Sequence, residues 1–270
     1  MPYAANPLQT VRSLLFTPGH LARLFPKAVA SPADCLTLDL EDAVPDTHKE
    51  TARDMIRSAL EAGQFAGRPV LARVNAFDSG VTARDIDGVA CRALHGFMYP
   101  MASSADEICA LAALLEERED ALGLAHGHFC LVPVIETAAG VLNAGAIAAA
   151  SPRLAGLLFG GEDYLADIDG QKDDDQWCFY TPRVQVVLAA RAAGIPPIDT
   201  PYVDIRDEAG FWAHCRRGRA IGMAGVALMS PAQVAAAHAI YSPSAEDVAW
   251  AQQMLDKLQE TRAGGRGMIV

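Results

Sequence analysis

Several features that would place the chain in a common class are absent from its sequence. No apolar run approaches the roughly 20 residues that a membrane-spanning helix needs. The 22 Lys and Arg residues against 33 Asp and Glu residues leave a net charge of -11. Such an excess of negative charge repels nucleic acids and anionic membranes. We therefore expect a soluble protein with neither a nucleic-acid nor a membrane partner.

Common cofactor and nucleophile motifs are also missing. The sequence has no G-x-G-x-x-G or G-x-x-x-x-G-K-[ST] segment for phosphates, no H-x-x-x-H pair for zinc and no G-x-S-x-G elbow. Its six cysteines form no C-x-x-C pair, and most lie in apolar stretches, where thiols behave as small hydrophobic side chains. Because the N-terminus shows no secretory signal, we expect reduced thiols and a cytoplasmic location.

The sequence does contain eight short apolar runs that alternate with stretches typical of helices. The runs carry few polar residues until their last positions, as in parallel strands that are buried on both faces. Eight such units favour a single (β/α)8 TIM barrel, with an open doubly wound sheet as the alternative. The predicted strands are residues 14–18, 35–42, 70–75, 96–100, 129–137, 154–163, 196–202 and 225–231.

Residues typical of helix starts and helix ends support this prediction. Several of the connecting stretches begin with Ser, Thr or an acidic residue and end at Gly, as helices commonly do. We expect one catalytic domain over residues 1–270, with a C-terminal helix and no separate lid domain. The predicted helices are residues 21–31, 48–63, 104–120, 139–151, 181–194, 208–222 and 244–264.

Two acidic residues close the fifth and sixth predicted strands, at the end where a TIM barrel carries its active site. They are Glu136 and Asp163. Mg²⁺ is usually held by one or two carboxylates, with water and substrate as the other ligands. Alternatively, Glu136 favours the N-terminus of the following helix and Asp163 caps its own loop. Spacing alone does not separate the two interpretations.

An arginine and three acidic residues close the third and second predicted strands. Arg73 offers planar, bidentate donors that match a substrate carboxylate. It is equally suited to a structural ion pair with Asp39 or Glu41, and both roles are compatible. We expect Asp39 and Glu41 on one face of the strand and Asp42 at the start of the turn. Three acids in four residues repel unless a cation faces them, so one is a candidate proton-transfer group with a raised pKa.

At these residues the chain resembles the citrate lyase β-subunit-like and malyl-CoA lyase family of the HpcH/HpaI aldolase superfamily. The resemblance implies that Glu136 and Asp163 bind Mg²⁺ and that Arg73 binds a 2-oxo acid. It also implies that Phe16 and Lys27 contact the nucleotide end of coenzyme A. Glu41 and Asp42 are the candidates for proton transfer. The similar stretches are residues 12–19, 36–53, 73–75, 133–144, 159–164, 198–211 and 231–255.

The resemblance also implies an activity. Family members cleave or form a carbon–carbon bond between an acyl-CoA and a 2-oxo acid such as oxaloacetate, glyoxylate or pyruvate. We therefore expect a Mg²⁺-dependent lyase for citryl-CoA, malyl-CoA or citramalyl-CoA. A homo-oligomer, either a trimer or a multiple of it, is carried over from the family.

Two alternatives remain open. One is a CoA-independent aldolase for 4-hydroxy-2-oxo acids, although the resemblance predicts a histidine in that branch where Asp42 stands. The other is a non-catalytic subunit that binds metal and oxo acid. Its motivation is the segment GVALMSP at residues 225–231, where many relatives carry a lysine and an I-H-P tripeptide.

Overall fold

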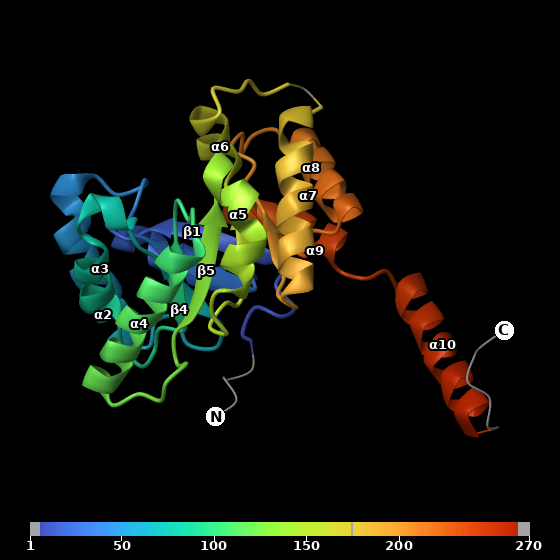
Figure 1. The fold of residues 1–270 in the computed structure, drawn as a ribbon, viewed down its shortest axis with the longest axis horizontal. Helices are drawn as coiled ribbons and strands as arrows, with labels where there is room; N and C mark the ends of the chain where they lie inside the picture. Colours follow the sequence, from blue (N-terminus) through green and yellow to red (C-terminus); the bar gives the residue numbers. More distant parts are fainter. Residues whose placement is uncertain (1–5, 174, 264–270) are drawn as a thin grey trace.

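The computed structural model describes residues 6–173 and 175–263, and in it eight parallel strands close into a barrel (Figure 1). Each strand pairs with the next along the chain, and β8 pairs with β1. The predicted TIM barrel is confirmed, and the open sheet is excluded. The strands are β1 Ser13–Pro18, β2 Cys35–Asp39, β3 Val70–Arg73, β4 Gly96–Tyr99, β5 Cys130–Ile135, β6 Leu157–Phe159, β7 Pro197–Asp199 and β8 Gly225–Leu228.

Helices connect the strands and surround the barrel, except for the last helix, which stands away from it (Figure 1). No helix in the described ranges combines the length and apolar character needed to cross a membrane. The α-helices are α1 Phe25–Ala30, α2 Lys49–Glu61, α3 Thr82–Val89, α4 Ala105–Leu122, α5 Ala138–Ala149, α6 Gly161–Asp167, α7 Trp177–Ala192, α8 Glu208–Ile221, α9 Val234–Tyr241 and α10 Ala245–Ala263. The 3₁₀ helices are η1 Ala22–Leu24, η2 Asp46–His48, η3 Phe77–Ser79 and η4 Pro231–Gln233.

Seven predicted helices are present in the structure. Three further helices and the start of α7 differ from the prediction. The short helices α3, α6 and α9 were not among those predicted. Helix α7 begins at Trp177, ahead of the predicted start, so that Pro182 lies inside it. The last residue of the predicted C-terminal helix, Gly264, lies outside the described residues.

The side chains that reach the active-site end of the barrel are those that face its interior. Successive side chains of a strand point to opposite faces, so every second residue faces inward. Phe16, Arg73 and Glu136 each lie two positions beyond a member of the interior cluster, and Asp39 lies four beyond. This alternation directs all four side chains into the C-terminal mouth of the barrel. The cluster consists of Leu8, Val11, Leu14, Cys35, Leu71, Met98, Cys130, Val132, Val134, Ala155, Leu158, Ile198 and Ala227.

Candidate active site

A cavity of about 450 Å³ opens at the C-terminal mouth of the barrel. Charged side chains occupy part of its wall, and apolar side chains occupy much of the remainder. Residues from seven strand–loop junctions therefore meet in one place, as predicted for this end of the barrel. The lining residues are Phe16, Pro18, Leu24, Asp39, Asp42, Ala43, Arg73, Val134, Glu136, Leu158, Gly160, Gly161, Glu162, Asp163, Thr200, Pro201, Val203 and Met229.

Arg73 is held at the cavity wall by a buried carboxylate on the neighbouring strand. The register of β2 and β3 sets Asp39 beside Arg73. Nε and Nη2 of Arg73 donate to Oδ1 and Oδ2 of Asp39, each over 2.7 Å. The guanidinium also lies over the Phe16 ring, with Cζ 4.9 Å from the ring centroid. The predicted ion pair between Arg73 and Asp39 is confirmed, and it fixes the plane of the guanidinium.

Two further acids approach the free side of the guanidinium. Nη1 of Arg73 lies 2.6 Å from Oε2 of Glu41 and 3.4 Å from Oδ2 of Asp42. Burial opposes the charge on Arg73, but its acidic neighbours, Asp39 foremost, outweigh burial and raise the pKa of Arg73. Burial also raises the pKa of Glu41 to about 7; Arg73 opposes this shift, while Asp42 and Asp39 add to it. A carboxyl group with this pKa can accept or release a proton near neutral pH.

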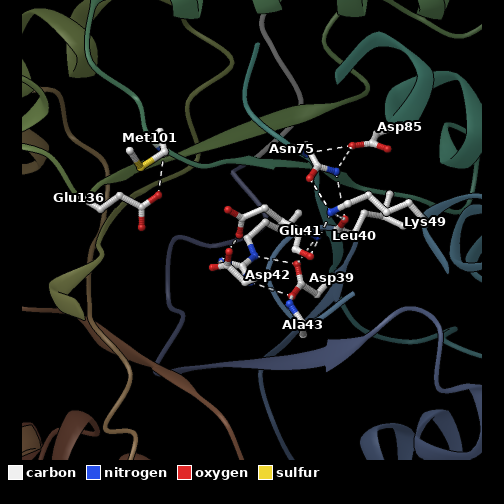
Figure 2. Close-up of polar contacts among 11 residues, drawn as sticks. Asp39, Leu40, Glu41, Asp42, Ala43, Lys49, Asn75, Asp85, Met101 and Glu136 are labelled. Carbon is white, nitrogen blue, oxygen red and sulfur yellow. Dashed lines mark hydrogen bonds and ion pairs between the residues drawn. The ribbon is translucent and has the colours of Figure 1, made fainter. Parts of the chain in front are cut away.

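The position of Glu41 corrects one prediction. Strand β2 ends at Asp39, so Glu41 does not share the strand but lies in the bend that follows it. The Asp39 carboxylate causes this bend, since it accepts hydrogen bonds from the backbone N–H groups of Glu41 (2.9 Å) and Ala43 (3.1 Å). Figure 2 shows this segment opposite Glu136.

Glu136 directly follows β5 and is 3% exposed. Its Oε1 accepts a hydrogen bond from the backbone N–H of Met101 over 2.7 Å (Figure 2). Helix α5 is capped by Thr137 instead, whose hydroxyl accepts from Gly140 N–H. The other side of the carboxylate rests against Gly160, where a Cβ would lie 2.6 Å from the Glu136 Cβ. Glycine at 160 is therefore required for this placement.

Asp163 lies in the first turn of α6 and not at the end of a strand, because β6 ends at Phe159. The predicted strand over residues 154–163 is thus wrong in its last four residues, where the glycine pair 160–161 leads into a helix. Asp163 still reaches the cavity beside Glu136.

The two carboxylates have the properties of a cation site. Burial raises the pKa of Glu136 to about 8, and Asp163 adds to this shift. Partial desolvation, followed by repulsion from Asp42, raises the pKa of Asp163. Adjacent acids of this kind are relieved by a bound cation. No group of three or more His, Cys, Asp or Glu side chains in the described residues is arranged to hold a metal. Mg²⁺ at this pair would complete its coordination with water and substrate.

Two residues lie beyond the charged part of the site. Phe16 lines the cavity, whereas Lys27 is exposed on α1 outside it, and their contact with coenzyme A stays a prediction. Thr200, which was not predicted, follows β7, and its hydroxyl accepts a hydrogen bond from Gly161 N–H over 2.8 Å. Thr200 thereby supports the start of α6. Its place near the end of the predicted strand over residues 196–202 was the signal in the sequence.

Known proteins share both the sequence pattern and the fold of this chain. Residues 12–231 match the family model described as HpcH/HpaI aldolase/citrate lyase. The chain belongs to this family. The matched residues make up most of the chain and include both Arg73 and Glu136.

Individual family members are similar over nearly their whole length. A (3S)-malyl-CoA thioesterase from Cereibacter sphaeroides is 33% identical in an alignment that covers all of this chain and 90% of the thioesterase. A citrate lyase subunit beta from Escherichia coli is 31% identical over 97% of this chain and 86% of its own. The structure of CitE from Mycobacterium tuberculosis with magnesium, acetoacetate and coenzyme A has a TM-score of 0.76 and 29% identity. That match covers 94% of this chain and 89% of CitE.

Proposed function

We propose that the protein is a Mg²⁺-dependent carbon–carbon lyase that acts on a 3-hydroxyacyl-CoA. Citryl-CoA, malyl-CoA and citramalyl-CoA are the candidate substrates, and an acyl-CoA and a 2-oxo acid are the products. One observation carries the proposal: the Arg73 guanidinium and the Glu136–Asp163 carboxylate pair lie in one cavity. Family membership and the ligands of the CitE structure support it.

The two sides of the cavity have separate tasks. Glu136 and Asp163 would hold Mg²⁺, which when bound acts as a Lewis acid toward the substrate oxygens. Arg73 carries five N–H donors, and Asp39 takes two of them. Nη1 faces Glu41 and Asp42, so the remaining donor on Nη2 is the one available to the carboxylate of the 2-oxo acid. The guanidinium thus both orients this carboxylate and offsets its charge.

Glu41 is the first candidate for proton transfer, and Asp42 is the second. In the cleavage direction, a base removes the proton of the substrate hydroxyl. The carbon–carbon bond then breaks, and the acyl-CoA carbon that keeps the electron pair is protonated. Glu41 is suited to this step because its pKa of about 7 lies near neutral pH and Arg73 stabilises its charged form.

Two further inferences concern the outer surface. We infer that Phe16, at the cavity wall, and the exposed Lys27, on α1, meet the nucleotide end of coenzyme A, with the lysine facing phosphate.

We also infer a homo-oligomer, a trimer or a multiple of it. Helix α10 supports this inference because Val248, Trp250 and Leu255 are 55%, 64% and 53% exposed on it. The six unpaired cysteines favour a cytoplasmic location.

A second candidate function is hydrolysis of the thioester. The observation that favours it is the similarity to a relative named (3S)-malyl-CoA thioesterase over the whole chain. The two reactions differ in their products. A lyase releases a 2-oxo acid and an acyl-CoA from malyl-CoA, whereas a thioesterase releases a hydroxy acid and free CoA.

A single assay tests these possibilities. Purified protein is incubated with Mg²⁺ and each of the three thioesters, and both 2-oxo acid and free thiol are followed. We expect 2-oxo acid release that EDTA abolishes and that Glu136→Gln lowers by roughly 100-fold or more. Glu117→Gln, a change of an exposed carboxylate on α4, serves as the matched control. Free thiol without 2-oxo acid would establish the thioesterase. Pyruvate release from a 4-hydroxy-2-oxo acid without CoA would instead support the aldolase, and binding without turnover would support the non-catalytic subunit.

A further inference from the structure

A lysine lies beneath the Glu41–Asp42 segment, and none of the steps above uses it. Lys49 is the first residue of α2, and its side chain is 14% exposed. Its Nζ donates to three oxygens: Leu40 O (3.0 Å), Glu41 O (3.3 Å) and Asn75 Oδ1 (2.7 Å). Figure 2 shows the ammonium group inserted between the segment and Asn75.

Helix stability does not account for this placement. The N-terminus of a helix carries partial positive charge and favours anions, so a cation at the first helical position is unfavourable. Lys49 also pairs with Asp46, whose carboxylate is 3.9 Å away and whose side chain is 99% exposed. Such an exposed ion pair contributes little. The three oxygen acceptors are therefore what holds the ammonium group in place.

Asn75 presents its carbonyl oxygen to Lys49 because its other groups are already engaged. Its Nδ2 donates to Leu40 O (3.0 Å) and to Asp85 Oδ2 (2.6 Å), and its backbone N–H also donates to Asp85 Oδ2. Asp85 is fully buried and accepts from Arg53 Nε over 2.8 Å. The amide orientation is thus fixed from the protein interior.

These contacts restrain Glu41 on both sides of its backbone. Its N–H donates to Asp39, which also binds Arg73, while its C=O and that of Leu40 accept from Lys49. The geometry points to Lys49 as a positioning residue. It holds the backbone of residues 40–42, so that the Glu41 and Asp42 carboxylates keep their placement against Arg73 and the cavity. The consequence for catalysis rests on the proposed lyase function, whereas the effect on the segment does not.

The kinetic test compares Lys49→Met with Glu50→Gln. Methionine keeps an unbranched chain but removes the donors, and Glu50 is the exposed neighbour on the same helix. We expect kcat to fall roughly 10- to 100-fold in Lys49→Met, as for other supporting residues of a site, with KM and Mg²⁺ affinity within about twofold of wild type. Glu50→Gln should leave all three unchanged. Lys49→Gln retains a donor on a shorter chain and should lie between wild type and methionine.

Amide hydrogen exchange supplies a readout that does not depend on turnover. In Lys49→Met, the amides of Glu41 and Ala43 should exchange at least tenfold faster, while those in the interior of α2 keep their rates. Unchanged exchange at both amides, or faster exchange with unchanged kcat, would overturn the inference. A uniform increase across α2 would also overturn it, because the lysine would then only stabilise the helix. If wild type turns over no thioester, the proposed function fails, and the exchange rates alone decide the role of Lys49.

Discussion

Acidification should destabilise the protein through one buried histidine, His214 on α8. The ring is 1% exposed, and its contacts define its protonation. Nε2 lies 2.9 Å from the carbonyl oxygen of Thr200, which only accepts, so Nε2 carries the proton. Nδ1 lies 3.0 Å from Nη2 of Arg183, which only donates, and 3.1 Å from Oε1 of Gln176. A second ring proton would place a charge in this buried site beside the guanidinium, and the neutral ring is therefore favoured.

The magnitude follows from the pKa. Burial lowers the pKa of His214 from 6.5 to about 4, and Arg183 adds to this shift while Asp199 opposes it. Between these two values the unfolded chain binds a proton that the folded protein does not, so stability falls as pH decreases from 6.5 to about 4. At about 1.4 kcal/mol per pKa unit, the full loss is about 3 kcal/mol. Above pH 6.5 the contribution of His214 no longer changes.

This effect is measured by urea unfolding of wild type and His214→Asn. The unfolding is monitored by circular dichroism at pH values between about 7.5 and 4.5. Asparagine does not titrate, so the stability difference between the two proteins should shrink on acidification by about 2 kcal/mol or more. Gln64→Ala, a change at an exposed residue whose side chain does not titrate, is the control and should leave the difference from wild type constant. A wild-type advantage over His214→Asn that stays within about 0.5 kcal/mol across this range would refute the argument.

Two further substitutions test the metal side and the outer surface. Gly160→Ala should displace the Glu136 carboxylate and weaken Mg²⁺ binding by roughly tenfold or more, because a Cβ there would lie 2.6 Å from the Glu136 Cβ. Calorimetric titration with Mg²⁺ measures the loss, and an unchanged affinity in a folded variant would contradict the role of Gly160. Leu255→Glu places a charge among the exposed apolar side chains of α10 and should shift the oligomer toward monomer in light scattering. A mass that stays at the wild-type value would exclude α10 from the interface.

Strand positions were the most predictable part of the fold. Runs such as residues 70–75 and 225–231 signalled buried parallel strands because they carry few polar residues until their last positions, and the eightfold alternation predicted closure. Short helices gave weaker signals. Helix α6 begins at Gly161 and contains seven residues, too few to show a helical period. Its opening glycine made the segment resemble the end of a strand, and Asp163 was consequently placed on the wrong element.

The ion pair of the site was predictable because both partners are charged and end neighbouring strands. Asp39 and Arg73 needed only strand order to be brought together. The support from Lys49 was not predictable, since two of its three acceptors are backbone carbonyl groups. Every residue carries such a group, and no pattern of side chains reveals which carbonyls will converge on a lysine. The same holds for Met101, which reaches Glu136 through its backbone N–H.

The two sides of the cavity differ in how firmly the folded chain holds them. Asp39 accepts four hydrogen bonds, two from Arg73 and two from the following bend, so the guanidinium is oriented before any ligand arrives. On the other side, Glu136 accepts one hydrogen bond from Met101. Asp163 extends from the short helix α6, whose first residue donates to Thr200 and whose last residue, Asp167, accepts from Ala138 N–H. Orientation on the Arg73 side is thus fixed by folding, whereas a bound cation would complete the carboxylate pair. Substitutions on the first side should therefore act mainly on kcat, and those on the second side mainly on metal affinity.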